Sequence, residues 1–110
     1  MGGNGVNMKT VFISGSITND LDDYKYKFNS AELDLIKRGY VVLNPAWLPI
    51  VGFSYEAYMR ISMAMLKERE AIYLLKGWEE SEGACCEKAY AEATGMEIMY
   101  DEEALQANGR

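Results

Sequence analysis

Four short runs of β-branched and aromatic residues alternate along this chain with three longer segments that have helical spacing. The runs cover residues 10–13, 40–43, 71–75 and 97–100, and the segments between them predict helices over about 20 or 22 to 38, 54 to 69 and 81 to 95. Strands that alternate with helices form parallel sheets with right-handed crossovers. We therefore predict an α/β fold with a parallel sheet of four to five strands, in the order 2-1-3-4.

This order is that of a flavodoxin-like (Rossmann-like) three-layer sandwich, and the length of the chain fits one such domain. With 110 residues the chain is long enough for one hydrophobic core and too short for two. We expect a single domain over residues 9–100. A disordered leader at 1–8 would precede it, and a polar tail at 101–110, with room for one helical turn, would follow it.

The composition argues against several classes of function. The formal net charge is −6, from 17 acidic and 11 basic residues. This balance argues against a nucleic acid polymer as the main partner, because polyanions select basic surfaces. The chain has no histidine, which is the commonest general base and transition-metal ligand. We therefore expect no metal and no cofactor.

The two cysteines, Cys85 and Cys86, are adjacent on the last predicted helix. Neighbouring helical residues point about 100° apart, so these two do not easily form a disulfide with each other. We interpret them as small buried hydrophobes in a protein of a reducing compartment. No run approaches the roughly 20 apolar residues of a membrane span. We expect a cytoplasmic protein with no membrane partner.

The strand order predicts where a ligand would bind. In an open parallel sheet the binding crevice lies beyond the carboxyl ends of the strands, where the order reverses. Here that point lies between the first and third strands, and the loops that reach it are 14–17 and 77–83. The first loop comprises Ser14, Gly15, Ser16 and Ile17. The second ends at Ser81 and Gly83, a helix start whose amides suit a phosphate or another anion. In the plainer alternative, Ser81 is only a helix cap and Ser16 only a turn residue.

Glu87 is the most informative residue of the last helix. Its neighbours three and four positions away are small or uncharged, namely Gly83, Ala84, Tyr90 and Ala91. A carboxylate on such a stripe loses water, which raises its pKa and is one mark of a functional acid or nucleophile. The alternative is a glutamate that reaches solvent from the helix edge.

Other candidates have two interpretations each. Trp78 is either a core residue or a wall on which a base stacks. Glu70, just before the third strand, is either an acid near the crevice or an exposed helix-end residue. The apolar segment 46–53 resembles the lids and walls of sites. The helix over 54 to 69 is apolar nearly all round, which predicts deep burial or a subunit contact. We expect a homodimer or a higher homo-oligomer.

Three segments together resemble nucleoside 2-deoxyribosyltransferase-like proteins, and most closely the small bacterial and phage-type domains of that superfamily. These are F-I-S-G-S-I-T at 12–18, G-Y-V-V-L-N-P at 39–45 and A-I-Y-L-L-K-G-W-E-E-S-E-G-A-C-C-E-K-A-Y-A at 71–91. The resemblance covers most of the chain, from about Met8 to Met99. Its S-x-G-x-x-x-E element, in a strand–loop–helix setting, is the most specific part.

The resemblance implies a flavodoxin-like fold and chemistry at the N-glycosidic bond of 2′-deoxynucleosides or their 5′-monophosphates. In that family a helix-borne glutamate attacks the deoxyribose, and the matching residue here is Glu87. Transferases usually have Asp six residues earlier, where this chain has Ser81. The nucleotide N-glycosidases instead have a serine there that helps to hold the 5′-phosphate. Glu70 stands where the family often has a further acid, as Asp. The expected alternative to an enzyme is a catalytically silent nucleotide or sugar-phosphate binding protein.

Overall fold

Four parallel strands form the centre of the protein in the computed structural model, which describes residues 9–107. The strands are β1 Thr10–Ser14, β2 Val41–Leu43, β3 Ala71–Leu74 and β4 Glu97–Tyr100. They lie in the order β2-β1-β3-β4, and every pair is parallel. This confirms the predicted α/β class, the strand order and the flavodoxin-like arrangement, with four strands within the described part of the chain.

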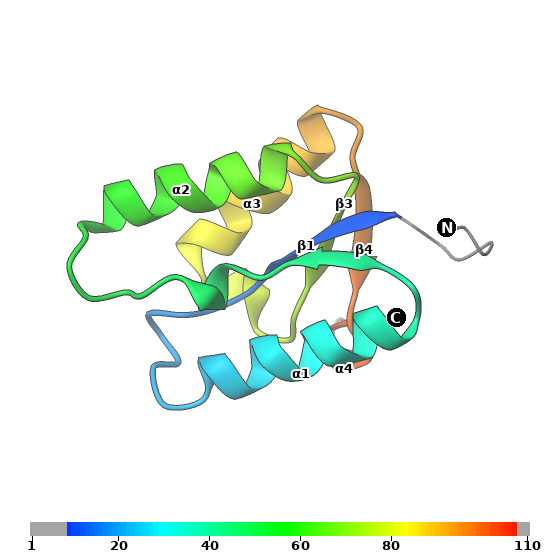
Figure 1. Cartoon of the computed structure of the whole chain (residues 1–110), viewed down its shortest axis with the longest axis horizontal. Coiled ribbons are helices and arrows are strands. Elements are labelled where there is room, and N and C mark those ends of the chain that lie inside the picture. The colour runs from blue at the N-terminus through cyan, green and yellow to red at the C-terminus, as the bar shows by residue number, and fades with distance from the viewer. Residues whose placement is uncertain (1–8, 108–110) are drawn as a thin grey trace.

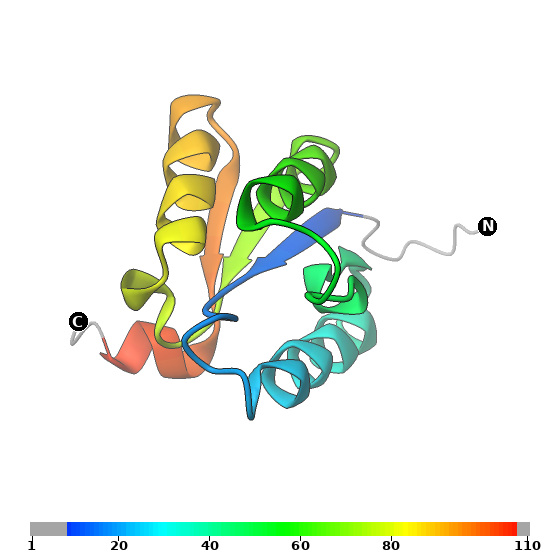
Figure 2. The same ribbon diagram turned by 90° about the vertical axis from the view of Figure 1, so that its left-hand side faces the viewer.

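Helices cover both faces of the sheet. Figure 1 shows α2 (Tyr55–Lys67) and α3 (Glu82–Ala93) above the strands, and α1 (Tyr24–Lys37) and α4 (Glu102–Ala107) below them. The same division into three layers is visible after a quarter turn (Figure 2). Two short 3-10 turns, η1 (Pro45–Trp47) and η2 (Trp78–Glu80), follow β2 and β3. The elements thus alternate along the chain as the sequence predicts.

The central strand β1 divides the core into two clusters, because successive side chains of a strand point to opposite faces. Val11 and Ile13 pack in a cluster with Phe28 and Leu35 of α1. Phe12 packs in the other cluster, whose buried members come from α2, α3 and β3: Leu66, Ala91, Ile72 and Leu74. By the same alternation Ser14, at the carboxyl end of β1, points to the face that α2 and α3 cover.

Side-chain caps and one glycine set several helix ends. The Ser54 hydroxyl accepts a hydrogen bond from the Ala57 amide at the start of α2, at 3.0 Å. Gly39, just after α1, has φ +93°, a backbone conformation that glycine adopts without steric cost. Asp101 accepts hydrogen bonds from two amides of α4. The segment predicted as a polar tail therefore begins with a six-residue helix, whose Ala104 is buried.

Two local predictions are wrong. The first helix begins at Tyr24 rather than at Asp20 or Asp22. The amides of Asp20 and Asp23 donate to the carbonyls three residues earlier, so the chain forms successive turns here before the regular helix starts. The two cysteines are exposed rather than buried, since α3 turns Ala84, Glu87 and Ala91 inward. The predicted leader at 1–8 lies outside the described residues. None of the helices within 9–107 has the length and apolar character needed to cross a membrane.

Candidate functional site

Glu87 lies on the buried face of α3, and its side chain meets residues from two other elements. Only 6% of its surface is exposed. The Ser14 hydroxyl, from the end of β1, donates a hydrogen bond to Oε1 at 2.6 Å. The Ser62 hydroxyl, from the middle of α2, donates to Oε2 at 3.1 Å. A strand end and two helices therefore hold one carboxyl group in place.

Burial dominates the acidity of this carboxyl. It raises the pKa of Glu87 from its ordinary value of 4.5 to about 7, and the hydrogen bonds from Ser14 and Ser62 lower it in part. Both protonation states are then populated near neutral pH. The interpretation of Glu87 as a solvated edge residue does not fit this environment, whereas a buried carboxyl with a raised pKa does.

A cavity of about 460 Å³ opens over this carboxyl. This volume lies within the range of roughly 300–1,000 Å³ that is usual for small-molecule sites. The loop after β1, the segment before α2, the first turns of α2 and the start of α3 form its walls. Its lining side chains are mostly apolar or aromatic and include Ile17, Phe28, Ile50, Phe53, Tyr55, Tyr58 and Met59.

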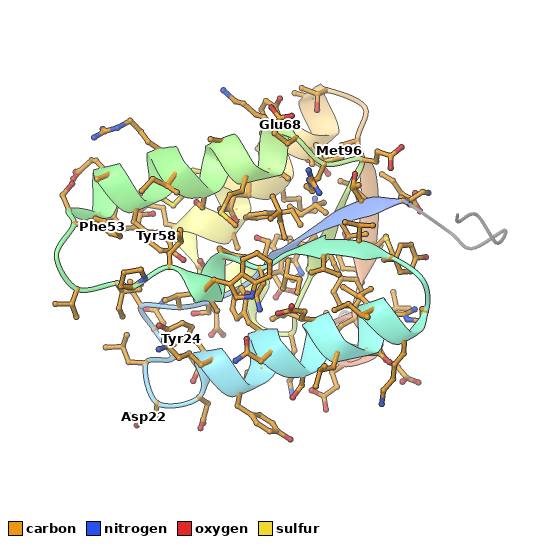
Figure 3. All side chains as sticks on the ribbon, in the orientation of Figure 1. Asp22, Tyr24, Phe53, Tyr58, Glu68 and Met96 are labelled. Carbon is orange, nitrogen blue, oxygen red and sulfur yellow. The ribbon has the colours of Figure 1, made fainter. Side chains whose placement is uncertain are left out.

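The aromatic wall comes from α2 and the segment before it. Phe53 and Tyr58 lie near each other at the N-terminal end of α2 (Figure 3). The Tyr58 hydroxyl donates a hydrogen bond to the Pro45 carbonyl at 3.2 Å, and burial raises the pKa of this phenol well above its usual range. Tyr58 is therefore a neutral wall residue at physiological pH. The apolar segment 46–53 does contribute to the cavity, through Ile50 and Phe53.

The start of α3 also lines the cavity, but its special residues are partly engaged in the fold. The Ser81 hydroxyl accepts a hydrogen bond from the Ala84 amide at 3.1 Å, so Ser81 is a helix cap as well as a cavity residue. A Cβ atom at Gly83 would lie 3.0 Å from the Met59 sulfur, so glycine here allows α2 and α3 to approach closely. A Cβ atom at Gly15 would similarly lie 3.1 Å from Leu75 Cβ.

The structure brings together most of the residues that the sequence singled out, and it leaves three aside. Those that line the cavity are Ser14, Gly15, Ile17, Ser81, Gly83 and Glu87. Ser16 is half-buried beside them but does not line it. Trp78 does not line it either: its ring packs on Tyr100 and beneath the Lys88 ammonium. Trp78 is therefore placed as a core residue rather than as a wall on which a base could stack.

Glu70 lies at the far end of the sheet. It accepts hydrogen bonds from the Thr10 amide and hydroxyl, at the start of β1. Ser14 is paired with Leu74, four residues after Glu70 on β3, a separation of about 13 Å along the strand. Within residues 9–107, the two hydrogen-bond partners of the Glu87 carboxyl are serine hydroxyls, and the other carboxyls that line the cavity are Glu80 and Glu82, both exposed.

Ser62 is the site residue whose role the sequence does not reveal. It is one of the few small polar residues on the otherwise apolar stripe of α2, and it is 1% exposed. A buried polar side chain requires a partner, so its place on that stripe is a usable signal. The sequence does not say that the partner is a carboxylate 25 positions later.

The chemistry of the site rests on one buried carboxyl group that lines a largely apolar cavity. Such a group can donate a proton, accept one, or attack an electrophilic carbon, depending on its protonation state. Within the described part of the chain, no cluster of three or more histidine, cysteine, aspartate or glutamate side chains has the arrangement of a metal site.

Comparison with known proteins assigns the chain to one family. A family model described as "Domain of unknown function (DUF4406)" matches residues 9–100, which span all four strands and the whole of the cavity. No curated protein and no solved structure matches the chain. The matched range covers well over half of the sequence, and the chain therefore belongs to the DUF4406 family.

Proposed function

We propose that this protein cleaves or transfers the N-glycosidic bond of a 2′-deoxynucleoside or its 5′-monophosphate, with Glu87 as the nucleophile. The observation that supports this most strongly is the position of Glu87: a buried carboxyl at the carboxyl end of the central strand, held by two hydroxyls in a cavity of ligand size. The resemblance to nucleoside 2-deoxyribosyltransferase-like proteins assigns the nucleophile to the same residue. The two arguments are independent of each other.

In the proposed reaction the Glu87 carboxylate attacks the anomeric carbon of the deoxyribose. A bond forms between a carboxylate oxygen and this carbon, while the C–N bond breaks and its electron pair leaves with the base, which then takes up a proton. The carboxylate also stabilises the positive charge that develops on the sugar ring in the transition state. Water or a second base then attacks the same carbon, which gives hydrolysis or transfer and restores the carboxylate.

The two serines have a role in this scheme. Each donates a hydrogen bond to the ionised carboxyl, so together they favour the form that attacks and fix its orientation. Burial opposes ionisation and keeps the pKa near 7. The reaction then has a rate that rises with pH and reaches half of its maximum near pH 7.

The test is release of free base from a panel of 2′-deoxynucleosides and their 5′-monophosphates. The substitution Glu87→Gln keeps the shape of the side chain and removes its charge. Glu92→Gln is the matched control, because Glu92 lies exposed on the same helix and its carboxylate, among residues 9–107, forms an ion pair with Lys88 away from the cavity. We expect release by the unmodified protein and by the control, and none by Glu87→Gln. Equal release by all three proteins would exclude Glu87 as the nucleophile.

A second candidate function is binding of a nucleotide or sugar phosphate without turnover. It is favoured by the immediate contacts of Glu87, which within residues 9–107 are two serine hydroxyls and no second acid. Thermal denaturation with and without nucleosides and nucleotides detects binding, since a ligand that binds the native state raises the midpoint temperature of unfolding. Together with the assay of base release it distinguishes a binding protein from an enzyme. Stabilisation without base release supports binding alone, and stabilisation with base release supports the enzyme.

We also propose that the chain self-associates through α2. Tyr55 of this helix is 46% exposed and lines a second groove between α2 and α3 together with the apolar side chains of Met59, Met63 and Ala64. Exposed apolar groups that cluster on one element are typical of protein interfaces. Sedimentation at micromolar concentration should show a species heavier than 12.4 kDa, and a single species of that mass would reject the proposal.

A further inference from the structure

The charges around the cavity are all of one sign. Glu80 and Glu82 lie among the residues that line it, and Glu87 lies at its base. None of the lining residues within the described range 9–107 is a lysine or an arginine. Arg60 lines the neighbouring groove between α2 and α3, and Lys76 is exposed on the loop after β3, outside the lining.

Some of the features that suggest a phosphate cradle in the sequence also have roles in the fold. The Ser81 hydroxyl caps the Ala84 amide, so one of the first-turn amides of α3 has an internal partner. Glu82 places a carboxylate in that same turn, where it offsets the positive end of the helix dipole. Gly83 lies in close contact with the flexible Met59 side chain of α2. A phosphate at this helix start would thus meet the Glu82 carboxylate, and none of the lining residues within 9–107 is a lysine or an arginine that could offset it.

The neutral part of the cavity suits an uncharged ligand. Its aromatic and aliphatic walls, Ile50, Phe53, Tyr55 and Tyr58, provide flat apolar surface for a base. Ser54 and Asn19 also line the cavity: the Ser54 hydroxyl accepts the Ala57 amide and keeps its own proton to donate, and the Asn19 side chain donates to the Glu80 carbonyl and keeps its acceptor oxygen for a sugar hydroxyl. The cavity therefore combines surface for a base and a sugar with a negative electrostatic field.

From this charge pattern we infer that the site selects 2′-deoxynucleosides over their 5′-monophosphates; the inference rests on the proposed function. A cleft lined by one sign of charge raises or lowers the local concentration of a charged ligand by about tenfold or more. The 5′-phosphate, with close to two negative charges at pH 7, is disfavoured by Glu80 and Glu82 at the rim. Specificity in this site then comes from repulsion of the phosphate, which is an effective way to discriminate between similar ligands.

The experiment compares each natural 2′-deoxynucleoside with the 5′-monophosphate that carries the same base, at low and at high salt. For base release we expect kcat/KM to be at least about tenfold higher for the nucleoside at low salt. This ratio should shrink at high salt, which screens exposed charges. Replacing both rim carboxylates, by Glu80→Gln with Glu82→Gln, should shift the ratio severalfold towards the monophosphate. Glu79→Gln is the control, because Glu79 is an exposed neighbour that does not line the cavity.

Different results would reject the selectivity for nucleosides and the proposed enzyme activity. A monophosphate that is cleaved as well as its nucleoside, or better, overturns the inference and leaves the proposed function intact. Absence of base release from every substrate overturns the proposed function. In that case thermal shifts with the same ligand pairs decide the inference: larger stabilisation by the nucleoside supports it, and stabilisation by the monophosphate alone, or by neither, rejects it.

Discussion

Glu87→Gln should stabilise the protein above about pH 4.5, increasingly up to about pH 7 and by a constant amount above it. Burial raises the pKa of Glu87 from 4.5 to about 7, so the folded state holds this proton more tightly than the unfolded chain does. Between these two pH values the native protein binds the extra proton, and its stability falls as pH rises. Each unit of pKa shift corresponds to about 1.4 kcal/mol, so the ionised carboxyl costs the folded state about 3 kcal/mol above pH 7.

Glutamine has nearly the same shape as glutamic acid and never ionises. The variant should therefore match the unmodified protein below about pH 4.5, where the carboxyl is protonated in both states, and exceed its stability by about 3 kcal/mol near pH 8. The assay is urea denaturation of both proteins at a series of pH values. Groups other than Glu87 titrate alike in the two proteins, so the difference isolates this residue. A difference that does not change with pH would refute the burial of an ionisable Glu87.

Three further predictions concern residues around the site and at the far end of the sheet. Ser62→Ala removes a hydrogen bond from ionised Glu87, so the pH at half-maximal base release should rise by about one to two units; an unchanged pH profile would contradict this. Gly15→Ala places a methyl group 3.1 Å from Leu75 Cβ, and urea denaturation should show a loss of about 1–3 kcal/mol. A fully stable variant would mean that this packing is loose. Glu70→Gln should leave base release unchanged, since Glu70 lies outside the cavity; a large loss of rate would restore it as the second acid.

The fold could be predicted because its signals are local. Period-two and period-3.6 patterns mark strands and helices within a few residues, and the rules for parallel sheets then leave few topologies. Glu87 could be found in the same way, because the small and uncharged residues around it on α3 are already visible in the sequence. The start of α1 could not be predicted from the sequence, because Asp22 and Asp23 suit a first helical turn and a preceding turn equally well.

What the sequence could not supply is the identity of contacts between elements. Ser62 and Glu87 are far apart in the chain, and their hydrogen bond exists because α2 and α3 pack on the same face of the sheet, where Glu87 also reaches Ser14 at the end of β1. The close approach at Gly83 depends on the Met59 side chain, so glycine there has a packing reason that resembles a phosphate-binding signal. Trp78 turns towards Tyr100 for a similar reason: its neighbours in space come from β4 and α3.

If Glu87 forms a bond to the sugar, the reaction passes through a covalent deoxyribosyl intermediate that can be trapped. The protein is mixed with its best deoxynucleoside substrate, quenched in acid within milliseconds to seconds, and digested for mass spectrometry. We predict a deoxyribosyl group on the peptide that contains Glu87, and neither this adduct nor base release in Glu87→Gln. Base release that persists in Glu87→Gln, or an adduct on a different residue, would contradict the account.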